Sequence, residues 1–130
     1  MGPCSDTPLA LSPEPGGRTW RVVNTYTAST PAGCLTVPAG TVTDLASIPR
    51  PLWTVYPPHG RYTWAAVAHD WLYRAGRWAD GTACTRPEAD SVLYDLAIHH
   101  GARRSKAWLF WLAVRAAGGP AWTRYRATTE

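Results

Sequence analysis

His69 and Asp70 are neighbours in the chain, and Asp90 follows about twenty residues later, in a second apolar segment. An unperturbed histidine titrates near neutral pH, so such a residue can take and return a proton under physiological conditions. A buried aspartate bonded to the second ring nitrogen would hold the ring in one tautomer and one orientation. These residue types therefore indicate general-base chemistry or a metal site. The alternative is a buried histidine that only satisfies a neighbouring backbone group.

Two predicted helices must position these side chains. The first spans residues 62–74. The second begins at Arg86, because Thr85 and Glu88 have the spacing of a capping box, in which each side chain bonds to the other residue's backbone amide. Gly101 ends the second helix. Its predicted apolar face consists of Ala89, Val92, Leu93, Leu96 and Ala97, with Asp90 at the edge.

The two residues of the His-Asp pair point in different directions, because neighbours on a helix are about 100° apart. We expect His69 to face Asp90 across an antiparallel helix pair. Asp70 would then face the loop that contains Asp44. The connection of roughly ten residues between the helices is long enough to reverse the chain.

The remaining elements indicate an α+β fold. We expect a small N-terminal antiparallel sheet and then a three-helix C-terminal half, whose antiparallel helix pair carries the site. Residues 1–17 contain four prolines and three glycines and predict a flexible arm, while residues 18–130 form a single globular domain. The predicted strands are 18–28, 34–38 and 41–43, the long proline-rich loop is 44–60, and the third helix is 103–117, closed by Gly118, Gly119 and Pro120.

The C-terminal part of the chain is basic and rich in tryptophan. Net charge is +4, and residues 101–130 hold six basic residues but one acid, Glu130. On the third helix, Leu109, Leu112 and Ala113 have the spacing of one buried face. Trp108 and Trp111 lie beside that face, so at least one should reach the surface. This pattern favours contact with a lipid surface or an acidic protein face over nucleic acid, and its alternative is a solvated basic face.

The cysteines and the apolar segments indicate the cellular compartment in which the protein is made. Cys4, Cys34 and Cys84 form no C-x-x-C motif and predict neither a zinc site nor a disulfide framework. Residues 1–17 lack the apolar stretch of a signal peptide, and no run approaches the roughly 18 apolar residues of a membrane span. We therefore expect synthesis in a reducing bacterial cytoplasm, without a transmembrane segment.

An ordered set of motifs over residues 40–118 resembles a family of tailed phages and prophages that carries a domain-of-unknown-function label. The matching stretches are TDLASIPR from Thr43, AAV and HDWLY between Ala65 and Tyr73, EAD from Glu88, and the segment from Trp108 to Arg115. The resemblance implies a phage origin. The protein would then be made in the host cytoplasm and could be incorporated in the virion beside other phage structural proteins.

The pattern His69-Asp70-x-x-Tyr73, followed by Asp90 in an apolar helix, is similar to the core of the small secreted phospholipases A2. In those enzymes the histidine is the general base for a water molecule, its neighbour binds calcium and the later aspartate orients the histidine. The resemblance implies that His69 is the base, that Asp70 is a metal ligand and that Asp90 orients the ring. Tyr73 and Tyr94 would supply supporting hydroxyl groups.

The same resemblance implies a calcium site formed by Asp70, Asp44 and the backbone carbonyl of Leu45. Calcium prefers such oxygen ligands, and it would polarise an ester carbonyl. The chain departs from the secreted enzymes here, because their disulfides are missing and residues 41–47 replace their glycine-rich loop. Val67 or Ala66 stands where those enzymes have a cysteine.

Three functions remain open. The first is a phage-encoded, calcium-dependent, phospholipase A2-like hydrolase of lipids or other esters. The second is a non-enzymatic tail or head component, in which His69, Asp70 and Asp90 form a structural hydrogen-bond network. The third is a metal-dependent hydrolase of another bond, because His59 and the same three residues loosely resemble the ligand order of the HD phosphohydrolases. A His69–Asp90 bond beside an open cleft would favour an enzyme.

Overall fold

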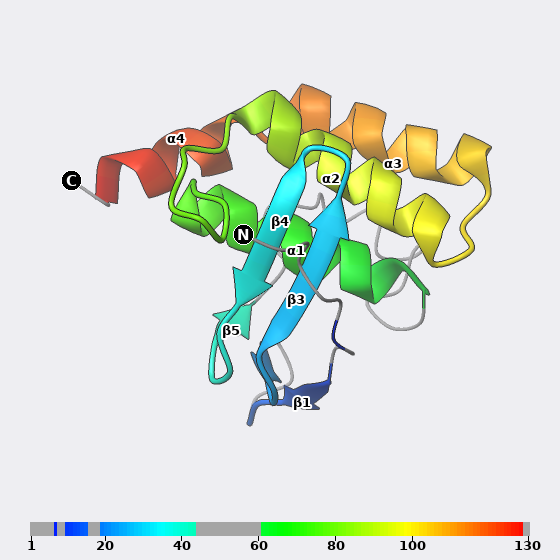
Figure 1. Ribbon diagram of the computed structural model, residues 1–130. Coiled ribbons are helices and arrows are strands. Elements are labelled where there is room, and N and C mark those ends of the chain that lie inside the picture. Colours follow the sequence, from blue (N-terminus) through cyan, green and yellow to red (C-terminus); the bar gives the residue numbers. More distant parts are fainter. Residues whose placement is uncertain (1–6, 8–9, 16–18, 44–60, 129–130) are drawn as a thin grey trace.

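The computed structural model describes residues 7, 10–15, 19–43 and 61–128. Strands come first and helices follow, which confirms the α+β class (Figure 1). The strands are β1 (Leu11–Pro13), β2 (Trp20–Val22), β3 (Tyr26–Thr30), β4 (Gly33–Val37) and β5 (Val42–Thr43). The helices are α1 (Arg61–Ala75), α2 (Arg86–His99), α3 (Arg104–Ala117) and α4 (Gly119–Thr128).

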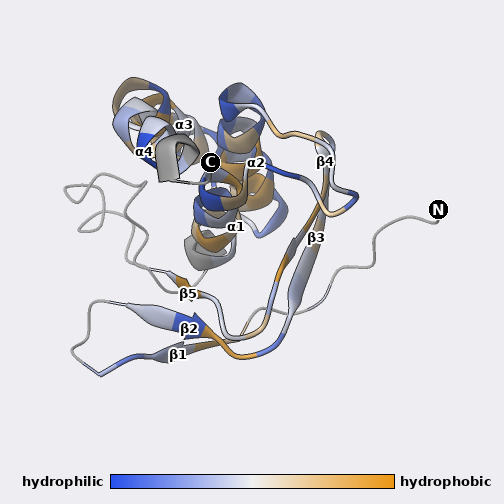
Figure 2. Ribbon diagram, turned by 90° about the vertical axis from the view of Figure 1, so that its left-hand side faces the viewer, coloured by the Kyte–Doolittle hydropathy of each residue, from blue (hydrophilic) through white to orange (hydrophobic). Residues whose placement is uncertain are grey.

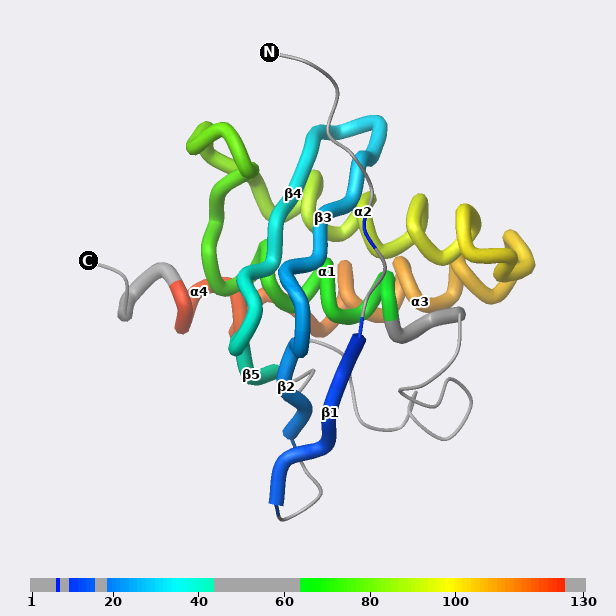
Figure 3. Tube along the Cα trace, turned by 60° about the horizontal axis from the view of Figure 1, so that its bottom comes forward, coloured from blue at the N-terminus to red at the C-terminus, as the bar shows by residue number. Residues whose placement is uncertain are grey.

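The strands form two small antiparallel sheets instead of one. The order in the first is β1-β2-β5, and β3 and β4 form a separate hairpin in which Tyr26 pairs with Val37. The predicted strand 18–28 is divided between the two sheets, because the chain bends at Asn24, a residue type that favours turns. Figure 3 shows the chain passing from β2 directly into β3.

Part of the predicted flexible arm is ordered. β1 lies within residues 1–17, and Leu11 of β1 is the partner of Val22 on β2. The backbone amide of Val23 also donates to the carbonyl of Ala10, at 2.8 Å. This stretch of the proline-rich arm, which the sequence predicts to be extended or flexible, is thus an extended strand, and proline is tolerated there because the strand pairs along one edge only.

The helices lie in layers beside the hairpin. α1 and α2 pack on each other, with β4 against α1 and β3 against α2. α3 and α4 cover the helix pair on the side away from the hairpin (Figure 2). The core between these layers includes Leu35, Val37, Leu72, Val92 and Leu93, all of which are buried.

The contacts between α1 and α2 run in opposite directions along the two helices. Tyr73 meets Arg86 near the connection, His69 meets Asp90 further along, and the rings of Trp64 and His100 stack at the far end. This order confirms the expected antiparallel pair. The capping box of Thr85 and Glu88 is also present at the start of α2.

The C-terminal half contains a fourth helix that the sequence did not predict. Gly118 ends α3, and α4 starts immediately at Gly119 with Pro120 in its first turn. The pattern Gly118-Gly119-Pro120 predicts the end of a helix. Proline is equally compatible with the first turn of a helix, where its missing amide is not needed.

The buried face of α3 also differs from the prediction. Ala107, Phe110 and Val114 are its buried residues. Leu109 and Leu112, which we expected to pack on the other helices, are 49% and 43% exposed. The two faces have the same helical spacing, and the position of α3 on its neighbours decides which of them is buried.

Cys34 and Cys84 differ in whether they form a disulfide. Cys34 on β4 is disulfide-bonded. Cys84, two residues before α2, is buried and is a thiol that forms no disulfide. The odd number of cysteines gave no reason to expect this bridge. None of the helices in the described part of the chain is long and apolar enough to cross a bilayer.

Candidate active site

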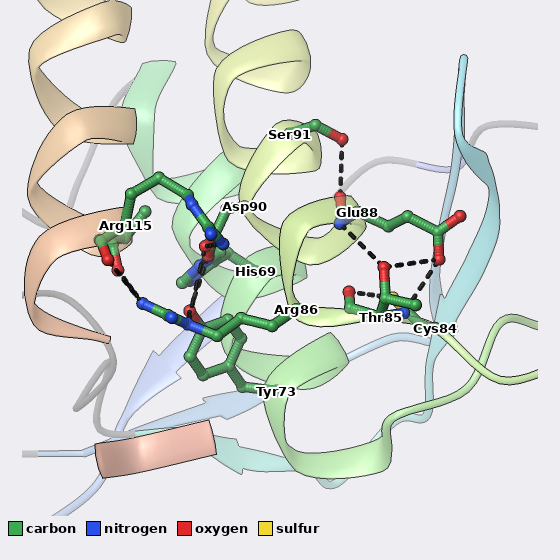
Figure 4. Close-up of polar contacts among 10 residues, drawn as sticks. His69, Tyr73, Cys84, Thr85, Arg86, Glu88, Asp90, Ser91 and Arg115 are labelled. Atoms are coloured by element: carbon green, nitrogen blue, oxygen red, sulfur yellow. Dashed lines mark hydrogen bonds and ion pairs between the residues drawn. The ribbon is translucent and has the colours of Figure 1, made fainter. Parts of the chain in front are cut away.

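His69 and Asp90 form a direct, fully buried pair. The Nε2 atom of His69 lies 2.7 Å from Oδ1 of Asp90 (Figure 4). His69 comes from α1 and Asp90 from α2, and the side chains of both are 0% exposed. The expected juxtaposition of these two residues across the helix pair is therefore present.

Tyr73 joins the same carboxylate one helical turn after His69. Its hydroxyl donates to Asp90 Oδ1 at 2.7 Å, and its ring contacts the His69 ring with centroids 4.3 Å apart. Residues four apart lie on one face of a helix, which explains why both side chains reach the same partner. Trp122 of α4 covers the other side of Tyr73 in an edge-on contact, with centroids 5.2 Å apart.

Two arginines complete the surroundings of Asp90. Nη1 of Arg115 on α3 donates to Asp90 Oδ2 at 2.8 Å, and Nε of Arg86 lies 3.9 Å from the same oxygen. Both carboxylate oxygens thus have partners. A buried carboxylate is stable only when it is paired and hydrogen-bonded in this way.

The protonation state of Asp90 follows from these contacts. Burial by itself would raise its pKa, but the hydrogen bond and charge of His69, together with Tyr73 and Arg115, hold the pKa below the ordinary value of 3.8. Asp90 is therefore ionised at neutral pH and only accepts hydrogen bonds. It follows that His69 Nε2 is the donor in this pair.

Tyr73 stays protonated in this setting. Burial and the hydrogen bond to Asp90 raise the pKa of its hydroxyl far above the ordinary value of 10.0. The phenol therefore serves Asp90 as a hydrogen-bond donor. It also accepts a hydrogen bond from Arg86 Nε at 3.1 Å.

Arg86 links the site to the end of α3. Its Nη2 atom donates to the backbone carbonyls of Val114 and Arg115, at 2.9 and 2.8 Å. The carbonyls in the last turn of a helix carry partial negative charge, so a cation is favourable there. Arg86 thereby holds α2, Tyr73 and the C-terminal turn of α3 together.

Gly118 is part of the packing around Tyr73. A Cβ atom at Gly118 would lie 2.6 Å from the Tyr73 hydroxyl, although the backbone there has ordinary right-handed helical angles. Gly118→Ala is therefore expected to lower the free energy of unfolding by about 1–3 kcal/mol, as overpacking usually does. Gly119→Ala is the matched control, because the nearest atom to a Cβ there is 3.7 Å away. Urea unfolding that affects both variants equally would contradict this account.

Asp70 lies in a second, smaller cluster. Thr43 Oγ1 donates to Asp70 Oδ2 at 2.6 Å, and Arg74 Nε lies 3.2 Å from the same oxygen. Arg74 also donates to the carbonyl of Val42 and lies over the ring of Tyr125. As expected from the helical geometry, Asp70 points away from the His69–Asp90 pair and toward the end of β5.

The described residues do not by themselves fit a calcium ion. They contain no group of three or more His, Cys, Asp or Glu side chains that could hold a metal. The guanidinium of Arg74 is paired with Asp70 through Oδ2 of the carboxylate. Asp44 and Leu45, the other expected ligands, lie outside the described residues, as does His59.

None of the described hydrogen bonds joins Tyr94 to Asp90. Its ring lines a hollow of about 260 Å³ between α2 and α3, together with Ser91, Trp108 and Trp111. The structure therefore brings His69, Tyr73 and Asp90 together. Tyr94 lines the hollow between α2 and α3 instead.

Sequence reasoning missed the four residues that pair with the two aspartates. Arg86 precedes Asp90 by four positions and Arg74 follows Asp70 by four, so helical spacing could have suggested both ion pairs. Arg115 and Thr43 come from other elements. Only the packing of α3 and β5 against the helix pair places them at the site.

One family model matches the chain, with the description "Protein of unknown function (DUF1353)", over residues 20–114. The match begins in β2 and ends in α3, and it includes His69, Tyr73 and Asp90. Neither a curated protein nor a solved structure matches the chain. Because the matched region covers well over half of the sequence and all of the α1–α2 pair, the chain belongs to the DUF1353 family of proteins of unknown function.

Proposed function

We propose that the protein is an ester hydrolase in which His69 activates water. The observation that carries the proposal is the 2.7 Å contact between His69 Nε2 and an ionised Asp90. This contact leaves Nδ1 as the basic atom of the ring and stabilises the imidazolium that forms when the ring takes a proton. Such an arrangement is the minimum that a general base requires.

In the proposed reaction, His69 Nδ1 removes a proton from water while the water oxygen attacks the ester carbonyl carbon. The tetrahedral intermediate collapses, the bond to the leaving alcohol breaks, and the imidazolium returns the proton to that alcohol. One water molecule is consumed, and a carboxylic acid and an alcohol are released. Asp90 keeps its negative charge throughout.

Tyr73 and Arg115 act on this chemistry through Asp90. They donate to different carboxylate oxygens, at 2.7 and 2.8 Å, and thereby fix the plane of the carboxylate against the ring. Their hydrogen bonds also lower the pKa of Asp90 and so help to keep it ionised. Both are positioning residues in this proposal, and neither contacts the reacting atoms.

The proposed substrates are phospholipids or other fatty acyl esters, and the proposed source is a phage. Both assignments rest on motifs: the His-Asp-x-x-Tyr pattern with its later aspartate for the substrate, and the longer set from Thr43 to Arg115 for the source. The 2.7 Å bond from Tyr73 to Asp90 supports the first, because it gives the tyrosine the supporting role that this pattern implies.

To test the proposal, the purified protein is incubated with a short-chain, monomeric acyl ester and with a long-chain phospholipid, and the hydrolysis of each is measured. In water enriched in ¹⁸O, the released carboxylate should carry one labelled oxygen, because water attacks the carbonyl carbon and the acyl–oxygen bond breaks. The alcohol and the acid should appear together, whereas a burst of alcohol ahead of the acid would indicate a covalent acyl-enzyme. No hydrolysis of any ester in the panel would contradict the proposal.

We also propose that Asp70 binds calcium, and this proposal is tested separately from the role of His69. Because Arg74 Nε is 3.2 Å from Asp70 Oδ2, a calcium ion must compete with this cation, and binding is expected to be weak, with a Kd of about 10⁻³ M. Arg74→Gln should strengthen binding in a calorimetric titration, and Asp70→Asn should abolish it. Arg103→Gln, an exposed change of equal charge, is the control. Binding unaffected by Asp70→Asn would place any calcium elsewhere.

A second candidate is a non-enzymatic phage tail or head component. The complete burial of His69 and Asp90 favours it, since a substrate reaches His69 only if the surrounding packing opens. The bonds from Arg86 to the end of α3 fit a network that only locks three helices together. In that case variants of the network change stability, and the protein hydrolyses no ester.

A further inference from the structure

α3 turns an apolar face toward solvent. Trp108, Leu109 and Leu112 are 50%, 49% and 43% exposed, and they account for three of the four large hydrophobic side chains that are exposed in the described part of the chain. They lie on the side of α3 opposite its buried residues Ala107, Phe110 and Val114. We call Trp108, Leu109 and Leu112 the outer face of α3.

Cations border the outer face on both sides. Arg104 and Lys106 are exposed, and on a helix they project about 100° to either side of Ser105, which is aligned with the outer face. Arg103, directly before the helix, is also exposed. No acidic residue occurs between Gly101 and Thr128, so this segment carries a net positive charge.

An aromatic hollow adjoins the outer face. It has a volume of about 260 Å³, and Trp108 and Trp111 of α3 line it with Tyr94 and Ser91 of α2. Trp108 therefore belongs to both features. Tryptophan and tyrosine combine an apolar ring with a polar group, which suits the boundary between lipid headgroups and acyl chains.

We propose that the outer face of α3 docks on the surface of an anionic lipid bilayer. α3 would lie in the plane of the membrane, with the outer face among the upper acyl chains and the three cations at the headgroups. An exposed apolar strip between cations is the arrangement that such interfacial helices use. α3 can do this without unfolding, because its opposite face is already buried on the protein. The helix itself lies on the side of the α1–α2 pair that is away from the hairpin (Figure 2).

Charge favours a lipid surface over a second copy of the chain. A symmetric dimer through the outer face would bring the cations of both copies together. That repulsion opposes self-association, whereas anionic headgroups attract each nearby cation. An acidic protein would supply negative charge but no fluid apolar layer for Trp108 and Leu112. Binding to an acidic protein is therefore the alternative that the experiment must detect.

The experiment is co-sedimentation of the full chain with vesicles of phosphatidylglycerol or of phosphatidylcholine. The protein should pellet with the anionic vesicles and much less with the zwitterionic ones, and raising salt from about 50 to about 500 mM should weaken the binding through screening. The double variant Trp108→Ser/Leu112→Ser should lose binding about tenfold or more. Arg104→Glu/Lys106→Glu should lose about 25-fold or more, since each nearby cation contributes about fivefold and both charges are reversed.

Val23→Ser is the matched control, because Val23 is 48% exposed and lies beside β2, away from α3. It should bind vesicles like the wild type, and circular dichroism should show that every variant is folded. Absence of binding to anionic vesicles would overturn the proposal. So would a dimer in analytical ultracentrifugation that Trp108→Ser/Leu112→Ser dissociates, or binding to acidic polypeptides but not to anionic vesicles.

This docking surface does not depend on the proposed hydrolase activity, and the two can fail separately. His69→Gln should leave vesicle binding unchanged, because His69 is buried and is not part of the outer face. Conversely, Trp108→Ser/Leu112→Ser should keep the hydrolysis of a short, monomeric ester and lose that of phospholipid in vesicles. Equal loss on both substrates would show that the variant damages the site and not docking.

Discussion

Replacement of His69 by alanine is expected to reduce ester hydrolysis by a factor on the order of 10² to 10⁴, which is the usual contribution of a general base. The reason is that no described side chain takes over the role of Nδ1 in the α1–α2 pair: Tyr73 stays protonated, because burial and Asp90 raise the pKa of its hydroxyl, and Asp90 already accepts hydrogen bonds on both oxygens. The measurement is the initial rate on a monomeric ester at saturating concentration.

His99→Ala is the control for this prediction, because His99 is exposed near the end of α2 and contacts His100 instead of an aspartate. It should keep the wild-type rate. His69→Gln is the second variant, since it fills more of the space of the ring than alanine does. If either His69 variant is folded and hydrolyses the ester at the wild-type rate, His69 is not the base.

Replacement of Asp90 by asparagine is expected to lower the free energy of unfolding at neutral pH by about 3–5 kcal/mol, the usual cost of breaking a buried charge pair. The amide of asparagine cannot accept from His69, Tyr73 and Arg115 on two oxygens at once. Arg115, which bonds Asp90 Oδ2 at 2.8 Å, would lose its carboxylate partner in a partly buried site. Urea unfolding followed by tryptophan fluorescence gives the change.

The effect of this substitution should depend on pH in a defined direction. The pKa of Asp90 is lower in the folded protein than its ordinary value of 3.8, so the stability that it contributes is fully present above that value. That contribution is lost as pH falls through the folded pKa. The difference between wild type and Asp90→Asn should therefore be constant near neutral pH and shrink below about pH 4.

Asp80→Asn is the control for the pH series. Asp80 is exposed, and its pKa is lowered by hydrogen bonds from the side chain and backbone of Thr82, two residues away. Its substitution should change the stability much less, because solvent screens an exposed group. A difference for Asp90→Asn that grows as the solution becomes more acidic would contradict the ionised state assigned to Asp90.

The dyad and the helices that hold it could be predicted from the sequence because their signals are local. Apolar residues at helical spacing indicate α1 and α2, and Thr85 with Glu88 marks where α2 begins. Four-residue spacing then puts His69 and Tyr73 on one face of α1, and the short connection makes the helix pair antiparallel. This geometry predicts that His69 meets Asp90, whereas the supporting role of Tyr73 is implied only by the resemblance to the phospholipases A2.

What surrounds the dyad depends on contacts between elements far apart in the chain, and local patterns carry little information about them. Arg115 reaches Asp90 only because α3 packs Ala107, Phe110 and Val114 inward, although its sequence permits another face to be buried. The same choice exposes Leu109 and Leu112. The sequence by itself thus determined a His–Asp pair on two helices, and the tertiary structure decided its charge partners and the surface beside it, because burial is settled by the packing of whole elements and not by their periodicity.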